Sequence, residues 1–224
     1  MKSYKIRRTL GFILVLIAFA VPLAKLSTED LPTLNELVSP IMADAEVASP
    51  ELNKLEVKGR APKTGYERAN FGDGWDSVFG CDTRNRVLAR DLKEVSLADD
   101  GCKVASGVLD DPYTGATIRF VRGPETSDDV QIDHVVALSN AWQTGAQQMD
   151  AATRVAFSND PLNLLAVSGP ANEQKSDGDA ATWLPPHKPF RCQYVARQIA
   201  VKQKYELWVT QAERAAMQRI LGEC

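Results

Sequence analysis

The run VQIDHVV, at residues 130–136, is followed by two further runs that carry polar side chains of the same kind of site, NDPLNLLAV at 159–167 and ANEQKSD at 171–177. A carboxylate stands beside a histidine at the end of an apolar run, and two asparagines and a lysine follow it along the chain. These residue types can supply a metal site, a general base and a phosphate contact. We therefore take the three runs as one candidate site and work outward from them.

Asp133 and Asn172 are the candidate metal ligands. An ion of the Mg²⁺ type takes oxygen ligands in octahedral geometry and usually keeps several waters, so one carboxylate and one amide oxygen from the protein suffice. The sequence predicts one divalent ion, Mg²⁺ in the first place and Mn²⁺ as the alternative.

His134 is the candidate general base, because a neutral imidazole can take a proton from an attacking water near neutral pH. Adjacent strand residues point to opposite sides, so Asp133 and His134 share a site only if the strand ends or kinks there. The alternative is a core histidine whose ring is satisfied by a backbone carbonyl. Asn163 is expected to orient the imidazole through a hydrogen bond, and Lys175 to place positive charge near the phosphate or, alternatively, to be a solvated helix residue.

Three arginines, Arg84, Arg86 and Arg90, are candidate substrate contacts. A helix predicted over 82–92 places Val87, Leu88 and Leu92 on one face and the arginines largely off it. The arginines form either a solvated basic face with local ion pairs or a set of phosphate contacts.

The three runs together resemble the HNH, or His-Me finger, nuclease motif, in the variety with Asn in place of the last His. The resemblance is closest to the GmrSD C-terminal-like family of modification-dependent restriction endonucleases, in its exported actinobacterial type. It extends over 66–224 and includes DTRN at 82–85, DPYTG at 111–115 and ATWLPP at 181–186. It implies a ββα-metal fold and metal-dependent phosphodiester hydrolysis, with Asp133 and Asn172 as ligands, His134 as base, Asn163 holding the site and Lys175 matching in position.

The hydrophobic pattern predicts an α+β fold, in which an N-terminal β-hairpin and C-terminal helices flank the core. The runs 102–109 and 116–122 alternate and are separated by a turn-forming cluster, as in a hairpin. Further strands are expected at 130–136 and 162–167, and helices at 139–157, 171–183, 191–207 and 210–221.

The N-terminal part differs in composition from the rest. Residues 1–26 have a basic start and an apolar run of about fifteen residues, typical of a signal peptide, with an uncleaved anchor as the alternative. Residues 27–62 are acidic and contain four prolines, which indicates a disordered linker or a pro-segment. The nuclease-like domain is then 63–224.

Four cysteines in an exported chain predict two disulfides. Three pairings are open, and we favour Cys81 with Cys102 and Cys192 with Cys224, because each closes a modest loop within one half of the chain. The spacing does not suit a CxxC zinc site or redox pair.

Charge excludes a strongly basic nucleic-acid binder: the net charge of the whole chain is -3, and residues 58–224 carry 20 bases against 22 acids. The expected function is a secreted endonuclease that cleaves DNA in preference to RNA. The alternative is a non-catalytic exported module that retains an ion site. No protein partner is predicted, and membrane contact is expected only through an uncleaved N-terminal segment.

Overall fold

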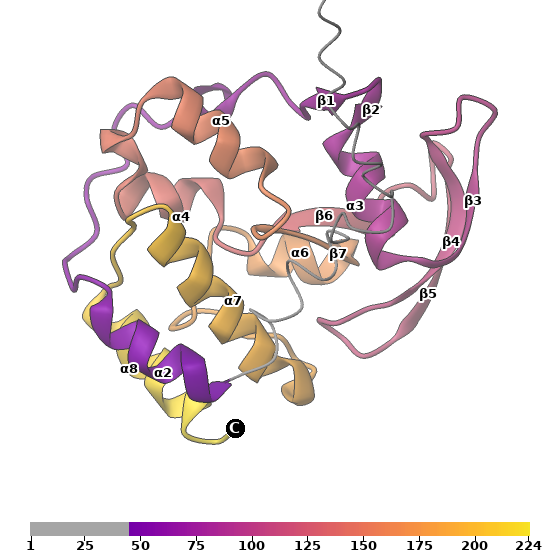
Figure 1. The fold of residues 1–224 in the computed structure, drawn as a ribbon. Helices are drawn as coiled ribbons and strands as arrows, with labels where there is room; N and C mark the ends of the chain where they lie inside the picture. The colour runs from indigo at the N-terminus through magenta and orange to yellow at the C-terminus, as the bar shows by residue number, and fades with distance from the viewer. Residues whose placement is uncertain (1–44) are drawn as a thin grey trace, which may run out of the picture. The chain divides into compact units, whose positions relative to one another are not determined.

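A computed structural model describes residues 45–224 (Figure 1). The signal-like segment 1–26 falls outside these residues. The α-helices are α2 (Ala45–Lys54), α3 (Thr83–Asp91), α4 (Leu138–Gln143), α5 (Ala151–Asn159), α6 (Gly169–Lys175), α7 (Arg191–Lys204) and α8 (Gln211–Leu221). The strands are β1 (Ser77–Val78), β2 (Cys81–Asp82), β3 (Lys93–Leu97), β4 (Val104–Asp110), β5 (Thr117–Val121), β6 (Val130–His134) and β7 (Leu164–Ser168). Short 3-10 helices are η1 (Arg68–Phe71), η2 (Ala146–Gln148) and η3 (Lys188–Phe190).

The antiparallel pair β6–β7 and the helix α6 that follows it carry the three sequence runs in the predicted order strand, strand, helix. In the register of the pair, Asp133 lies opposite Leu165 and His134 opposite Leu164. β7 is buried along its whole length. The segment between the two strands forms α4, η2 and α5, so the pair is closed by a long connection and not by a hairpin turn.

The predicted hairpin is present as β4 and β5, which pair antiparallel from Ser106–Val121 to Asp110–Thr117. A third strand, β3, pairs with β4 and was not predicted. Its sequence KEVSL is mostly exposed, and its pairing shifts register between Lys93 and Ser96. A polar edge strand with an irregular register has no clean alternation, which is why the pattern did not indicate it.

The pair β6–β7 separates two of the three apolar clusters. Ile132 and Leu164 belong to a cluster with α3 and β4, whereas Leu165 and Val167 belong to a cluster with α7 and α8. A third cluster gathers η1, α4 and α5 around Phe157. Because side chains alternate along a strand, a pair between two clusters is apolar on both faces, and this explains the nearly continuous apolar run of β7.

Two predicted helices are shorter than expected. The helix predicted over 139–157 is divided into α4, η2 and α5, because Gly145 adopts a left-handed φ of 136° and Asp150 starts a new helix by accepting a hydrogen bond from the Thr153 amide. The helix predicted over 171–183 begins at Gly169 and ends at Lys175. Ser176 follows with a φ of 50°, which ends the helix.

The sequence predicted a disordered linker or a pro-segment over 27–62, and the described part of it, residues 45–62, is ordered and not disordered. Residues 45–54 form α2, which packs on α7 and α8, and Val57 pairs with Val209 in a parallel bridge. Ala48, Leu52 and Leu55 of this region are buried in the cluster with α7 and α8. Their spacing of four and three residues is a helical period that the acidic, proline-containing composition obscured.

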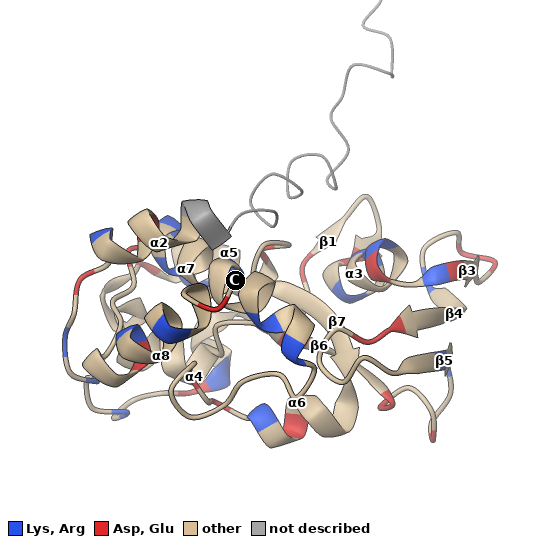
Figure 2. Ribbon diagram, turned by 90° about the horizontal axis from the view of Figure 1, so that it is seen from below, with Lys and Arg blue, Asp and Glu red and all other residues tan. Residues whose placement is uncertain are grey.

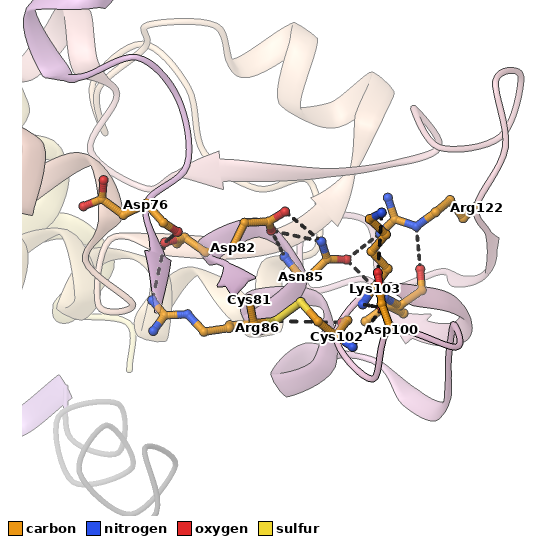
Figure 3. Close-up of a disulfide and its surroundings, with 11 residues drawn as sticks. Asp76, Cys81, Asp82, Asn85, Arg86, Asp100, Cys102, Lys103 and Arg122 are labelled. Atoms are coloured by element: carbon orange, nitrogen blue, oxygen red, sulfur yellow. Dashed lines mark hydrogen bonds and ion pairs between the residues drawn. A yellow bond between two sulfur atoms is a disulfide. The ribbon is translucent and has the colours of Figure 1, made fainter. Parts of the chain in front are cut away.

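The favoured cysteine pairs are the ones that the structure contains, Cys81–Cys102 and Cys192–Cys224. Figure 3 shows the first disulfide beside Asn85, whose amide donates to Asp82 and accepts from the Arg122 guanidinium. The disulfide and this network hold α3 against the start of β4. Within 45–224, no helix combines the length and apolar character needed to cross a bilayer.

Candidate active site

A cavity of about 540 Å³ opens at the end of β6, where the strand stops at His134. Its lining includes Asp133, His134 and Asn172. Because the strand ends here, the two adjacent residues Asp133 and His134 can reach one cavity, which is the condition that the prediction of a shared site set. Further lining residues come from the segment before β1 and from α3, namely Lys63, Tyr66, Arg68, Trp75 and Arg84.

Asp133 is 4% exposed, and two side chains hold its carboxylate. The Tyr113 hydroxyl donates a short hydrogen bond to Oδ2, and the Lys175 ammonium donates to Oδ1 at 2.9 Å. Burial raises the pKa of Asp133, and the charge of Lys175 and both hydrogen bonds oppose that shift. The carboxylate is therefore fixed in orientation at the cavity wall.

Lys175 lies under the site and not on the cavity wall. It is 2% exposed, and its ammonium contacts the Asp133 carboxylate and the carbonyl of His134, both at 2.9 Å. The expected phosphate contact is not what this arrangement provides. Instead, Lys175 neutralises the buried carboxylate and ties α6 to the end of β6.

His134 is 7% exposed and lies between a backbone carbonyl and an indole. Its Nε2 is 2.9 Å from the Ser158 carbonyl oxygen, and its ring stacks on Trp75 with centroids 5.7 Å apart and planes 9° apart. A carbonyl only accepts, so Nε2 carries the proton of the neutral ring and Nδ1 keeps its lone pair. Burial lowers the pKa of His134 to about 3, which makes the ring neutral at pH 7.

Asn163 is fully buried and holds the chain just after His134. Its Oδ1 accepts from the Val136 amide at 2.8 Å, and its backbone carbonyl accepts from the Val135 amide at 2.8 Å. The predicted hydrogen bond to the imidazole is replaced by these bonds to the backbone. Asn163 therefore positions His134 indirectly, by fixing where β6 ends.

Two buried or half-buried arginines hold the loop that carries Asn163. Arg197 donates to the carbonyls of Pro161, Leu162 and Leu164, and Arg90 donates to those of Pro161 and Leu164. Arg90 also pairs with Asp91. The predicted substrate contact Arg90 is thus part of the internal scaffold.

The other two candidate arginines are placed differently from each other. Arg84 lines the cavity and donates to the carbonyls of Ser127 and Val130 at 3.3 Å. Arg86 is not a lining residue and contacts the Thr83 hydroxyl at 3.4 Å. Of the three, only Arg84 is brought to the candidate site.

Asn172 and Asp133 offer a minimal set of hard oxygen ligands. The Asn172 amide nitrogen donates to Gln131 at 2.8 Å, and no residue of 45–224 donates a hydrogen bond to its Oδ1. Each Asp133 oxygen accepts one hydrogen bond and keeps a second lone-pair site. No cluster of three or more His, Cys, Asp or Glu side chains suited to a metal occurs within 45–224. The donor set therefore fits an ion that retains most of its waters, such as Mg²⁺, and does not fit a zinc site.

Sequence reasoning missed three contributors to the site: Tyr113, Trp75 and the Ser158 carbonyl. Tyr113 belongs to the DPYTG run that contributed to the family resemblance, so that run was a signal without an assigned role. Trp75 is half-buried at the cavity and packs against the cluster that contains Ile132 and Leu164. The role of the Ser158 carbonyl could not be predicted from the types of side chain in the sequence, because every residue has a backbone carbonyl.

Comparisons with known proteins identify a family for most of the chain. The family model of the C-terminal domain of GmrSD restriction endonucleases matches residues 82–220. A protein of Arthroderma benhamiae described as an uncharacterized secreted protein is 38% identical over 188 residues, which cover 83% of this chain and 88% of the relative. No solved structure matches.

Proposed function

Because the chain belongs to the family of GmrSD restriction endonuclease C-terminal domains, we propose that it is a secreted, metal-dependent endonuclease of the HNH type that hydrolyses phosphodiester bonds, with DNA as the first substrate to test. The observation that carries the proposal is the neutral His134 fixed by the Ser158 carbonyl in the same cavity as Asp133 and Asn172. Two disulfides and a relative named as secreted support export.

In the proposed reaction, Nδ1 of His134 takes a proton from the attacking water. The Ser158 carbonyl holds the proton on Nε2, and this leaves Nδ1 as the nitrogen that acts as the base. A phosphate in the cavity would raise the pKa of His134 from its low value, because a nearby negative charge favours the imidazolium form. Stacking on Trp75 restricts rotation of the ring.

Asp133 and Asn172 would hold the ion in this proposal. When bound, a divalent ion would stabilise the charge that develops on the phosphate and on the leaving oxygen. Tyr113 and Lys175 orient the Asp133 carboxylate before the ion arrives. The β6, β7 and α6 elements would then form a ββα-metal core.

Plasmid cleavage by the purified chain, with Mg²⁺, Mn²⁺ or EDTA, tests the proposal. We expect cleavage with either ion and none with EDTA, and a loss of roughly 10²-fold or more in His134→Ala, the scale of a lost general base. His187→Ala is the matched control, because His187 is the chain's other histidine and lies at a separate cavity, beside Pro112. A wild type that is inert with every metal, or a His134→Ala variant of full activity, would refute the assignment.

Two observations favour a non-catalytic alternative. His134 is buried with its Nε2 against the Ser158 carbonyl, as in a core histidine. Both Asp133 oxygens are already bonded, one of them to an ammonium, as in a purely structural buried pair. In that case the chain would bind nucleic acid without cleaving it. Binding of an oligonucleotide by a wild type that cleaves no plasmid would identify this alternative.

A further inference from the structure

Residues 57–71, here called the strap, precede the residues that match the family model. The strap starts where Val57 pairs with Val209 and runs past α4. The amide of Ala61 donates to the Gln143 carbonyl at 2.9 Å, and the Trp142 indole donates to the Thr64 carbonyl at 3.3 Å. These bonds fix the path of the strap to the cavity, which it reaches at Lys63, Tyr66 and Arg68.

Arg68 differs from the other cations that line the cavity. Lys63 pairs with Asp177 at 3.2 Å, and Arg84 donates to two backbone carbonyls. The Arg68 side chain is exposed and makes no hydrogen bond or ion pair with any residue of 45–224. Among the described lining residues, Arg68 is therefore the cation whose side chain makes neither a hydrogen bond nor an ion pair.

Arg68 also lies near the candidate base. It lines both the main cavity and an adjoining one of about 230 Å³, and His134 and Trp75 line both as well. Burial is the main cause of the low pKa of His134, and the positive charge of Arg68 adds to it. A guanidinium in this place can offer a phosphate two parallel N–H donors.

We propose that Arg68 binds a backbone phosphate of the nucleic-acid substrate, so that the strap completes a substrate site that the family-matched residues hold only in part. The proposal rests on the proposed function for the identity of the substrate. A near-neutral protein needs local cations to hold a polyanion, and an unpaired arginine beside the base meets that need without breaking any internal contact.

Binding of a fluorescent single-stranded DNA 12-mer to the full chain, measured in EDTA between 50 and 200 mM salt, tests the proposal. His134→Ala is the parent, which prevents cleavage. Arg68→Ala should weaken binding roughly tenfold, as expected for one charge-assisted contact. It should also reduce the magnitude of the negative slope of the log association constant against log salt concentration by about 0.7. Arg219→Ala, which removes the same charge from an exposed position on α8, should change neither value.

In the wild-type background, Arg68→Ala should raise KM for DNA more than it lowers kcat, and Arg68→Lys should recover part of the loss. If the wild type cleaves DNA while Arg68→Ala keeps the parent's affinity and salt slope, the Arg68 assignment is overturned and the nuclease stands. If the wild type binds but does not cleave, and Arg68→Ala weakens that binding, the catalytic proposal fails and the Arg68 assignment stands. A parent that binds no DNA, together with a wild type that cleaves none, overturns both.

Discussion

At the scale of single residues, Asp133 is the point on which the candidate site depends. It is a carboxylate enclosed by protein, and burial alone would favour its neutral form. Lys175 supplies the compensating charge, and Tyr113 supplies a donor from the loop between β4 and β5. The contact with Tyr113 links the N-terminal hairpin directly to the site.

Tyr113→Phe tests this link. The ring contacts of Tyr113 remain in the variant, but Asp133 loses a hydrogen bond to a buried charged group, so we expect the free energy of unfolding to fall by about 1.5–3 kcal/mol. Urea unfolding at pH 7 measures the change. Tyr66→Phe is the control, because no hydrogen bond joins the Tyr66 hydroxyl to any residue of 45–224, and it should stay within about 0.5 kcal/mol of wild type. Equal stability of the two variants would contradict the role of Tyr113.

Sequence reasoning placed residues at the site better than it assigned their contacts. Asp133, His134 and Asn172 were chosen from residue type and order, and they line one cavity. Asn163 and Lys175 make contacts other than those expected, because both depend on how β6 ends and on which atoms are then left buried. Such contacts are set by tertiary packing, which a linear pattern does not contain.

At the scale of elements, an ion pair holds the N-terminal end of the strap, before the residues that line the cavity. Arg60 donates to Asp179 Oδ2 at 2.7 Å, and Asp179 Oδ1 accepts from the amides of Ala181 and Thr182 in the loop after α6. Burial of Asp179 would raise its pKa, but the hydrogen bond and charge of Arg60 outweigh burial and lower the pKa below its ordinary value. The pair joins the strap to the loop that follows the site helix.

Asp179→Asn should loosen the strap while Oδ1 keeps its backbone bonds. A lowered folded pKa means that the ion pair stabilises the fold fully above the unfolded value of 3.8 and is lost as pH falls through the folded value. We expect the free energy of unfolding of wild type to exceed that of Asp179→Asn by at most about 1 kcal/mol at pH 7, and this difference should shrink towards pH 3. Urea unfolding from pH 3 to 7 measures it.

The double variant Arg60→Gln/Asp179→Asn separates the pair from other effects of the substitution. It should be no less stable than Asp179→Asn alone, because the partner is already lost. A difference between wild type and Asp179→Asn that grows on acidification would contradict the ion-pair account.

Elements with a strong local pattern were predicted, and those that depend on distant partners were not. Strands β4 to β7 follow from alternating or apolar runs between turn residues. Strand β3 depends on β4 for its pairing, and α2 depends on α7 and α8 for a surface to cover. Neither dependence is visible in the local sequence.

At the scale of the whole molecule, basic and acidic residues are mixed along the helices and strands of residues 45–224. Figure 2 shows Lys and Arg interspersed with Asp and Glu along the helices and strands. This distribution agrees with the near-neutral count for residues 58–224. Affinity for a polyanion must then come from the cavity and not from a long-range field.

The boundary of the folding unit is the last feature to test, because the sequence placed it at 63 and the structure includes α2. Leu52 of α2 is 1% exposed where this helix packs on α7 and α8. The Lys58 amide donates to the Val209 carbonyl at 3.0 Å. A chain that begins at Lys63 would expose the apolar surface that α2 covers. It should therefore unfold at a lower urea concentration and a lower Tm than a chain that begins at Ala45.

Single substitutions in α2 give the same test without shortening the chain. Leu52→Ala should lower the free energy of unfolding by about 2–4 kcal/mol through lost burial and the cavity left behind, whereas Ser49→Ala at an exposed position should change it by less than about 0.5 kcal/mol. Both shortened chains keep Arg68 and His134, so a loss of stability is separable from a loss of the site. If the two chains unfold at the same midpoint and Leu52→Ala is neutral, α2 does not belong to the cooperative unit, and the boundary at 63 is restored.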